Sequence, residues 1–151
     1  MKYVKLFEGF LNESSIETQI IPFLKLPVGY TTVIEDDDIN VTILNNGKEA
    51  GFFRFSGTET FKGIDYIVAE TIFIEPEHRR KGIYGAIINA AILYGKKNGK
   101  TKGVISFPFD MDSGDFERSQ DANAFWENLV VNKKAVKHKT DDGIIYTTKI
   151  A

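Results

Sequence analysis

Two apolar runs separated by a short basic turn constrain the fold most. Residues 65–74, DYIVAETIFI, are almost continuously apolar and rich in β-branched side chains, which predicts a buried central strand. Residues 82–99, GIYGAIINAAILYGKKNG, repeat apolar side chains at helical spacing on most faces, and Asn98-Gly99 ends the pattern. A buried strand that is followed at once by a buried helix predicts a sheet with helices packed on it.

Shorter patterns on either side of this unit predict the rest of the fold. A β-branched run begins at Tyr30, and Asn46-Gly47 supplies the tip of a hairpin. A second helix begins after Ser119, a good N-cap, and buries a stripe that includes Trp126. The expected strands and hairpins cover residues 30–35, 40–57, 65–74, 103–109 and 133–150, and the expected helices cover 3–12, 82–99 and 119–131. This order predicts an α/β (α+β) fold with a mixed sheet.

Composition excludes several kinds of chemistry. The 151 residues contain no cysteine, so disulfides, thiolate metal sites and a thiol nucleophile are excluded. The formal net charge of -2 gives no overall basic field, so we expect no nucleic-acid partner. No apolar run approaches the roughly 18 residues that a membrane helix needs, so we expect no membrane partner. Residues 110–115, DMDSGD, lack the closing Glu of a calcium loop, so we expect no metal.

The turn between the two apolar runs carries the strongest chemical signal. It reads EPEHRRKGIYG over residues 75–85 and places three cations and a glycine at the expected start of the helix: Arg79, Arg80, Lys81 and Gly82. Unpaired N–H groups and the helix dipole favour an anion there, and a glycine lets the anion approach the backbone. A solvated basic turn would fit the same residues. The spacing excludes the G-x-x-x-x-G-K-[ST] and G-x-G-x-x-G phosphate loops.

The turn resembles the central signature of the GCN5-related N-acetyltransferase superfamily, Q/R-x-x-G-x-G/A between a strand and a helix. Residues 79–82 match its first four positions. Tyr84 stands where the family has Gly or Ala, and Gly85 comes one place late. The string FWENLVV at 125–131 is similar to the family's second signature, and the order of elements agrees over residues 30–150.

The resemblance implies a fold and a reaction. The fold is a mostly antiparallel sheet with helices on both faces and a splayed central parallel strand pair, 66–74 and 103–109. The reaction is transfer of an acetyl group from acetyl-CoA to an amine, without a metal. The implied cofactor-binding residues are Ile72 and Ile74 through their backbone for pantetheine, Arg79, Arg80, Lys81, Gly82, Tyr84 and Gly85 for pyrophosphate, and Ser119 for a further pantetheine contact.

Glu70 is the candidate catalytic base. An acceptor amine with a pKa of about 10.4 must lose a proton before it attacks a thioester. Glu70 lies inside the apolar strand, where alternation predicts that it shares a face with Ile72 and Ile74. The alternative is that it pairs with a basic side chain on an adjoining strand. Trp126 stands where many relatives carry a Tyr that protonates the thiolate, but an indole is no acid at neutral pH, and core packing is the favoured interpretation of Trp126.

Residues 1–13 stand apart from a single acyltransferase domain at 14–151. They fit either an N-terminal helix or a propeptide, because LFE and LNE resemble cleavage sites of capsid-targeting propeptides in large tailed phages. We therefore expect a cytoplasmic N-acetyltransferase for a small-molecule or protein amine, monomeric or homodimeric. The alternative is a catalytically inactive CoA-binding or phage-head-packaged protein with the same fold. His78 and His138 show no partner in the sequence, so we expect them on the surface.

Overall fold

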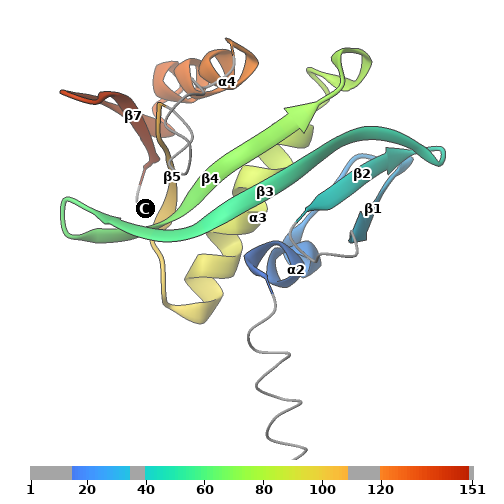
Figure 1. Ribbon diagram of the computed structural model, residues 1–151, viewed down its shortest axis with the longest axis horizontal. Coiled ribbons are helices and arrows are strands. Elements are labelled where there is room, and N and C mark those ends of the chain that lie inside the picture. The colour runs from blue at the N-terminus through green and yellow to red at the C-terminus, as the bar shows by residue number, and fades with distance from the viewer. Residues whose placement is uncertain (1–14, 35–39, 109–119, 150–151) are drawn as a thin grey trace, which may run out of the picture.

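A computed structural model describes residues 15–34, 40–108 and 120–149, and seven strands in these residues form one sheet (Figure 1). The strand order is β1-β2-β3-β4-β5-β7-β6, and every neighbouring pair is antiparallel except β4 with β5. The strands are β1 (Tyr30–Ile34), β2 (Val41–Asn45), β3 (Lys48–Phe61), β4 (Ile64–Ile74), β5 (Gly103–Ser106), β6 (Ala135–Thr140) and β7 (Gly143–Thr148). The helices are α2 (Ile16–Ile20), α3 (Ile83–Asn98) and α4 (Gln120–Val131), with 3-10 turns η1 (Ile21–Phe23) and η2 (Pro76–His78). The predicted α+β class with a mixed, mostly antiparallel sheet is confirmed.

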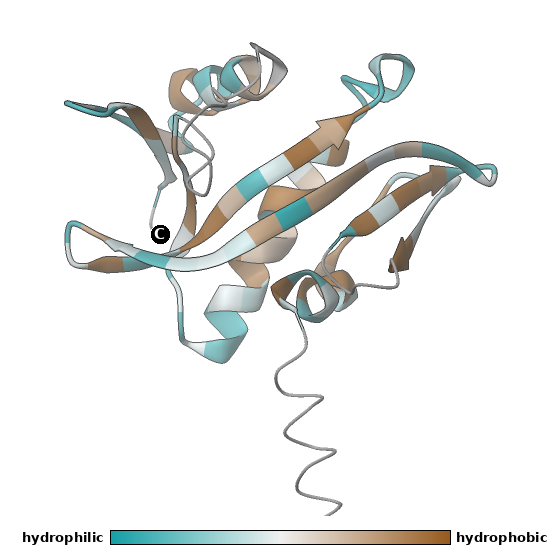
Figure 2. Ribbon diagram, viewed as in Figure 1, coloured by the Kyte–Doolittle hydropathy of each residue, from teal (hydrophilic) through white to brown (hydrophobic). Residues whose placement is uncertain are grey.

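One large apolar cluster lies between the sheet and the described helices. Ile20 of α2, Ile87 of α3 and Trp126 of α4 all belong to it and are fully buried. A smaller cluster around Tyr66 and Ile105 lies on the opposite face, and among the described residues only strand and loop side chains build it. Figure 2 shows the apolar segments along β4 and α3, with hydrophilic residues at the turns between strands.

The described helices therefore share one face, which differs from the expected helices on both faces. The crossovers β4–α3–β5 and β5–α4–β6 run in the same direction along the sheet, since β6 is parallel to β5 through β7. Crossovers between parallel strands are right-handed, so two crossovers that advance in one direction place their helices on the same face.

The central parallel pair is splayed, as predicted. Pairing joins β4 to β5 only where residues 66–68 lie beside 103–105. From Ile105 onward β5 pairs with β7 on its other side, while β4 continues to Ile74. In the described parts of the chain, no strand pairs with β4 beyond Val68 on the side that faces β5.

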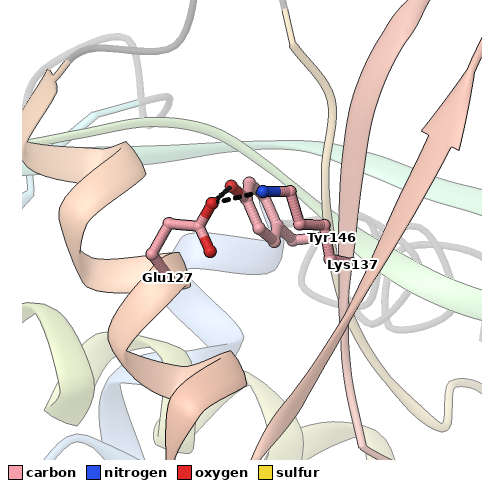
Figure 3. A network of polar contacts seen from close by, with 3 residues as sticks. All are labelled: Glu127, Lys137 and Tyr146. Carbon is pink, nitrogen blue, oxygen red and sulfur yellow. Dashed lines mark hydrogen bonds and ion pairs between the residues drawn. The ribbon is translucent and has the colours of Figure 1, made fainter.

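Helix α4 is joined to the closing hairpin by a polar network (Figure 3). Glu127 accepts a hydrogen bond from the Tyr146 hydroxyl of β7 at 2.9 Å and one from Lys137 Nζ of β6 at 2.6 Å. The hydrogen bond that Lys137 donates to Glu127 raises the pKa of Lys137. Glu127 belongs to the FWENLVV string, so this string fixes the hairpin to the helix layer.

Several sequence predictions fall outside the described residues. They concern the segment 1–13, Ser119 and the acid-rich stretch 110–115. Within the ranges that the structure describes, no helix is both long and apolar enough to cross a membrane.

Candidate functional site

The basic turn leads from the end of β4 into α3 through two left-handed residues. After η2, Arg79 is extended, Arg80 has a φ of 64°, and Gly82 has a φ of 84° as the N-cap of α3. A left-handed conformation is unfavourable for Arg80, because its Cβ crowds the following carbonyl. Backbone turns of this kind bring successive N–H groups together into an anion-binding concavity. The turn therefore has the backbone form of an anion site.

The N-terminus of α3 is open. Gly82 has no side chain, no side-chain cap bonds to this end, and the first turn holds no acidic residue. A Cβ built on Gly82 would meet no atom within 4 Å. The first N–H groups of a helix have no partner within the helix, and its dipole adds positive potential there. This uncapped N-terminal end at Gly82, the mouth of α3, can thus accept an anion without displacing a capping side chain.

The three predicted cations have different roles. Arg79 Nε donates a hydrogen bond to the Ile74 carbonyl at 2.8 Å, and its guanidinium lies 5.9 Å from the centre of the Phe73 ring. Arg79 therefore braces the turn against the end of β4. Arg80 and Lys81 are exposed, so their charges remain on the surface beside the mouth of α3.

Tyr84 connects α3 to α4. Its ring lies against the Phe125 ring of α4, with centroids 4.1 Å apart, and a Cβ on Gly85 would lie 3.8 Å from the same ring. The departure from the family pattern at Tyr84 thus supplies a helix–helix contact. A Cβ at Gly85 would make only an ordinary van der Waals contact there, so the tyrosine–phenylalanine contact does not require a glycine.

The backbone of Ile72 and Ile74 faces the open side of β4. The Glu75 N–H donates to the Ala50 carbonyl of β3 at 2.8 Å, and the Phe73 carbonyl points at Gly51 of β3. Backbone groups alternate along a strand, so those of Ile72 and Ile74 point away from β3. The Ile74 carbonyl is bound by Arg79. The N–H groups of Ile72 and Ile74 and the carbonyl of Ile72 therefore lie along the edge of β4 from which β5 has diverged.

Glu70 occupies a β-bulge and not the face that alternation predicts. Arg54 pairs with Thr71 and Phe55 with Ala69, so Glu70 is an extra residue in β4. Its carboxylate forms an ion pair with Arg54 Nε at 3.0 Å, and its side chain is 9% exposed. The alternative role predicted for Glu70, pairing with a basic side chain on an adjoining strand, is what the structure shows.

The prediction that Glu70 shares a face with Ile72 and Ile74 is therefore wrong. Arg54 lies between Phe53 and Phe55, which both belong to the large cluster. Its side chain therefore projects from the opposite face of β3. Ile72 and Ile74 pack on that cluster, whereas Glu70 reaches Arg54. One bulged residue is enough to reverse the alternation.

A second carboxylate near Arg54 was missed by the sequence reasoning. Glu17 of α2 is 3% exposed and accepts a hydrogen bond from the Phe55 N–H. Burial raises the pKa of Glu17, although this hydrogen bond and the charge of Arg54 oppose the shift. A signal existed in the run AGFFRF, where Arg54 is the one cation among apolar residues and favours acidic partners.

Trp126 is a core residue. It is completely buried and stacks on Tyr146 with ring centroids 5.8 Å apart and planes 15° apart. Its Nε1 has no hydrogen-bond partner among the described residues. The interpretation of Trp126 as core packing is confirmed.

Both histidines have partners, in contrast to the expectation of plain surface residues. His78 Nδ1 lies 2.7 Å from the Tyr30 hydroxyl. His138 contacts Lys62 Nζ at 3.3 Å and Thr147 Oγ1 at 2.9 Å. In the described ranges, no three His, Cys, Asp or Glu side chains are grouped so that they could hold a metal ion.

In comparisons with known proteins, this chain resembles some solved structures in the path of its backbone. No family model matches the chain, and no curated protein matches it. A PaiA N-acetyltransferase from Thermoplasma acidophilum, solved with coenzyme A, is 13% identical over 74% of this chain, with a TM-score of 0.47. Ard1 from Thermoplasma volcanium is 15% identical over 78% of this chain and 73% of its own, with a TM-score of 0.45. This chain spans 60% of the length of the first protein.

Proposed function

We propose that this chain is an acyl-CoA-dependent N-acetyltransferase that moves an acetyl group from acetyl-CoA to a primary amine. One observation carries the proposal. The uncapped mouth of α3, with Arg80 and Gly82 in left-handed conformations, lies at the end of a strand whose outer edge is open where a parallel partner splays away. The turn matches the first four positions of the N-acetyltransferase signature, with Tyr84 departing at the sixth, and the strand pair has the splay which that resemblance implies.

The residues present fit coenzyme A as a substrate. The diphosphate would meet the first N–H groups of α3, with Arg80 and Lys81 adding charge. The pantetheine amides would pair with the backbone of Ile72 and Ile74, and acetyl-CoA would supply an activated thioester. The Ile74 N–H is the proposed donor to the thioester oxygen. Tyr84, Gly85 and Ser119 remain proposed contacts, and Ser119 lies outside the described residues.

Glu70 is the proposed proton acceptor. It precedes Ile74 by four residues, roughly 13 Å along a strand, so it lies along the path of the pantetheine arm and away from the diphosphate. The acceptor amine attacks the thioester carbon; the C–N bond forms, the C–S bond breaks, and the electron pair leaves on sulfur. Because the thioester proposed at Ile74 lies roughly 13 Å from Glu70, the proton of the amine passes to Glu70 through intervening water molecules, and water protonates the thiolate. In the free protein the Glu70 carboxylate forms an ion pair with Arg54. For this step Glu70 would give up that ion pair and interact with the positive charge of the acceptor amine instead.

A catalytically inactive CoA-binding protein with the same fold is the second candidate. Trp126 is sealed in the core where relatives carry a proton donor, and Glu70 is paired with Arg54. Packaging of such a protein in a phage head rests on residues 1–13, which lie outside the described residues. A cytoplasmic location, the choice between monomer and homodimer, and the identity of the amine also remain predictions of the sequence.

Calorimetry and thiol release separate these candidates. Titration of the full chain with coenzyme A should release heat, and acetyl-CoA with a panel of amines should produce free thiol. The chain has no cysteine, so a thiol reagent detects product alone. Glu70→Gln should retain binding and lose most of the turnover. Binding without turnover on any amine would support the inactive candidate, and no heat with coenzyme A would remove both.

A further inference from the structure

The basic turn is held by a residue from the far end of the sheet. The Tyr30 hydroxyl of β1 lies 2.7 Å from His78 Nδ1, and the two rings meet edge to face with centroids 5.5 Å apart. The two residues are 48 positions apart in sequence. In either tautomer of His78 one hydrogen bond joins the hydroxyl to Nδ1. This contact fixes the last residue of η2.

Tyr30 is itself a rigid anchor. Its N–H donates to the Pro27 carbonyl at 3.3 Å, and it pairs with Asn45 in the β1–β2 ladder. Its side chain packs on the large apolar cluster. The contact with Tyr30 therefore fixes the position of His78 relative to the core, and not relative to another loop.

The turn needs such an anchor because it holds an unfavourable conformation. Arg80 is non-glycine with a φ of 64°, and such residues persist only where the surroundings fix them. On the C-terminal side the start of α3 fixes Gly82. On the N-terminal side, the Arg79 bond to Ile74 and the Tyr30–His78 contact fix the chain just before Arg80.

We infer that Tyr30 and His78 are positioning residues that hold the turn at residues 79–85 in its anion-binding form. The inference rests on the proposed function for its ligand, coenzyme A. Neither side chain is required to touch the ligand. The Tyr30–His78 contact acts through the backbone of Arg80 and Gly82, so it should affect recognition of the diphosphate and not of the pantetheine arm.

The test compares two ligands in two matched tyrosine variants. Tyr30→Phe keeps the ring and removes the hydroxyl, and it should raise the Kd for coenzyme A roughly fivefold to tenfold, as expected for one lost hydrogen bond. The Kd for pantetheine, which lacks the diphosphate, should stay unchanged. Tyr94→Phe is the control, because Tyr94 also donates a hydrogen bond between elements, to Gln19 at 2.6 Å. Tyr94 lies eleven residues, or roughly 17 Å, beyond the start of α3 at Ile83. Tyr94→Phe should change neither Kd.

Conservative replacement of His78 adds a rescue test. His78→Asn places a polar atom near the Nδ1 position and should keep most of the affinity for coenzyme A, whereas His78→Leu should lose it as Tyr30→Phe does. Equal losses for coenzyme A and pantetheine in Tyr30→Phe would show a general loss of structure and overturn the inference.

A ligand-free measurement separates this inference from the proposed function. Amide hydrogen exchange at residues 79–85 should be faster in Tyr30→Phe than in the wild type and unchanged in Tyr94→Phe. If the wild type does not bind coenzyme A, the proposed function fails, and the exchange rates still decide whether Tyr30 holds the turn. Unchanged exchange in Tyr30→Phe would overturn the positioning role itself.

Discussion

Glu17 shows how one buried carboxylate depends on its partners. Burial raises its pKa above the usual 4.5, so its contribution to stability is fully present below pH 4.5 and is lost as pH rises through the folded-state pKa. Glu17→Gln keeps an acceptor for the Phe55 N–H without the charge, and at pH 7 we expect it to be at least as stable as the wild type. Glu17→Ala leaves that buried N–H unpaired and should lower the free energy of unfolding by about 1–3 kcal/mol.

Urea unfolding at pH 4 and pH 7 measures both variants. The advantage of Glu17→Gln should be present at pH 7 and absent at pH 4, where the wild-type side chain is protonated. A Gln variant as unstable as the Ala variant at pH 7 would show that Glu17 needs its charge, and that its Coulomb attraction to Arg54 outweighs the cost of burial.

At the scale of elements, the turn before α3 combines backbone shape with charge, and Arg80→Gly separates the two. Glycine accepts the left-handed conformation, so relief of strain offsets the greater entropy of the unfolded chain, and stability should change by less than about 1 kcal/mol. The lost charge should raise the Kd for coenzyme A roughly fivefold to tenfold and weaken its dependence on salt. Lys133→Gly is the matched control, because Lys133 also has a left-handed φ, 60°, and lies after α4. Equal effects of both substitutions on the Kd would contradict a local role for Arg80.

Local patterns predicted the elements of this site, whereas contacts between distant segments were not visible in the sequence. Apolar periodicity and the positions of Pro and Gly residues predicted where β4, the turn and α3 lie. The motif at 79–82 predicted the open N-terminal end of α3. The bulge at Glu70 has no sequence signal, because any residue can be the extra one, and it reversed the predicted face. The Tyr30–His78 pair depends on how the sheet brings β1 beside η2, which periodicity cannot reveal.

At the scale of the whole molecule, His138 links the edge strand β6 to the β3–β4 turn, which belongs to the middle of the sheet. It lies on β6, yet its ring meets Phe61 with centroids 4.9 Å apart and its Nδ1 lies 3.3 Å from Lys62 Nζ, at the β3–β4 turn. Its Nε2 lies 2.9 Å from Thr147 Oγ1 on β7. Burial lowers the pKa of His138, and the charge of Lys62 lowers it further. The folded protein therefore favours the neutral imidazole, which can accept a hydrogen bond from Lys62.

The lowered pKa of His138 predicts that the free energy of unfolding decreases in acid. The raised pKa of Glu17 predicts a change of the opposite sign. The unfolded chain binds a proton at His138 near the usual pKa of 6.5, above the folded value, so stability is fully present above pH 6.5 and falls as pH drops through that range. His138→Gln cannot titrate, and its free energy of unfolding should vary less than that of the wild type between pH 7.5 and 5.5. Denaturant unfolding of both proteins at several pH values gives the difference curve. Because Glu17 gains stability toward acid while His138 loses it, the Glu17→Gln and His138→Gln difference curves should slope in opposite directions. A flat difference curve for His138→Gln would mean that the imidazole binds a proton equally well in the folded and the unfolded chain, and that its burial between β7 and the β3–β4 turn does not disfavour the charged form.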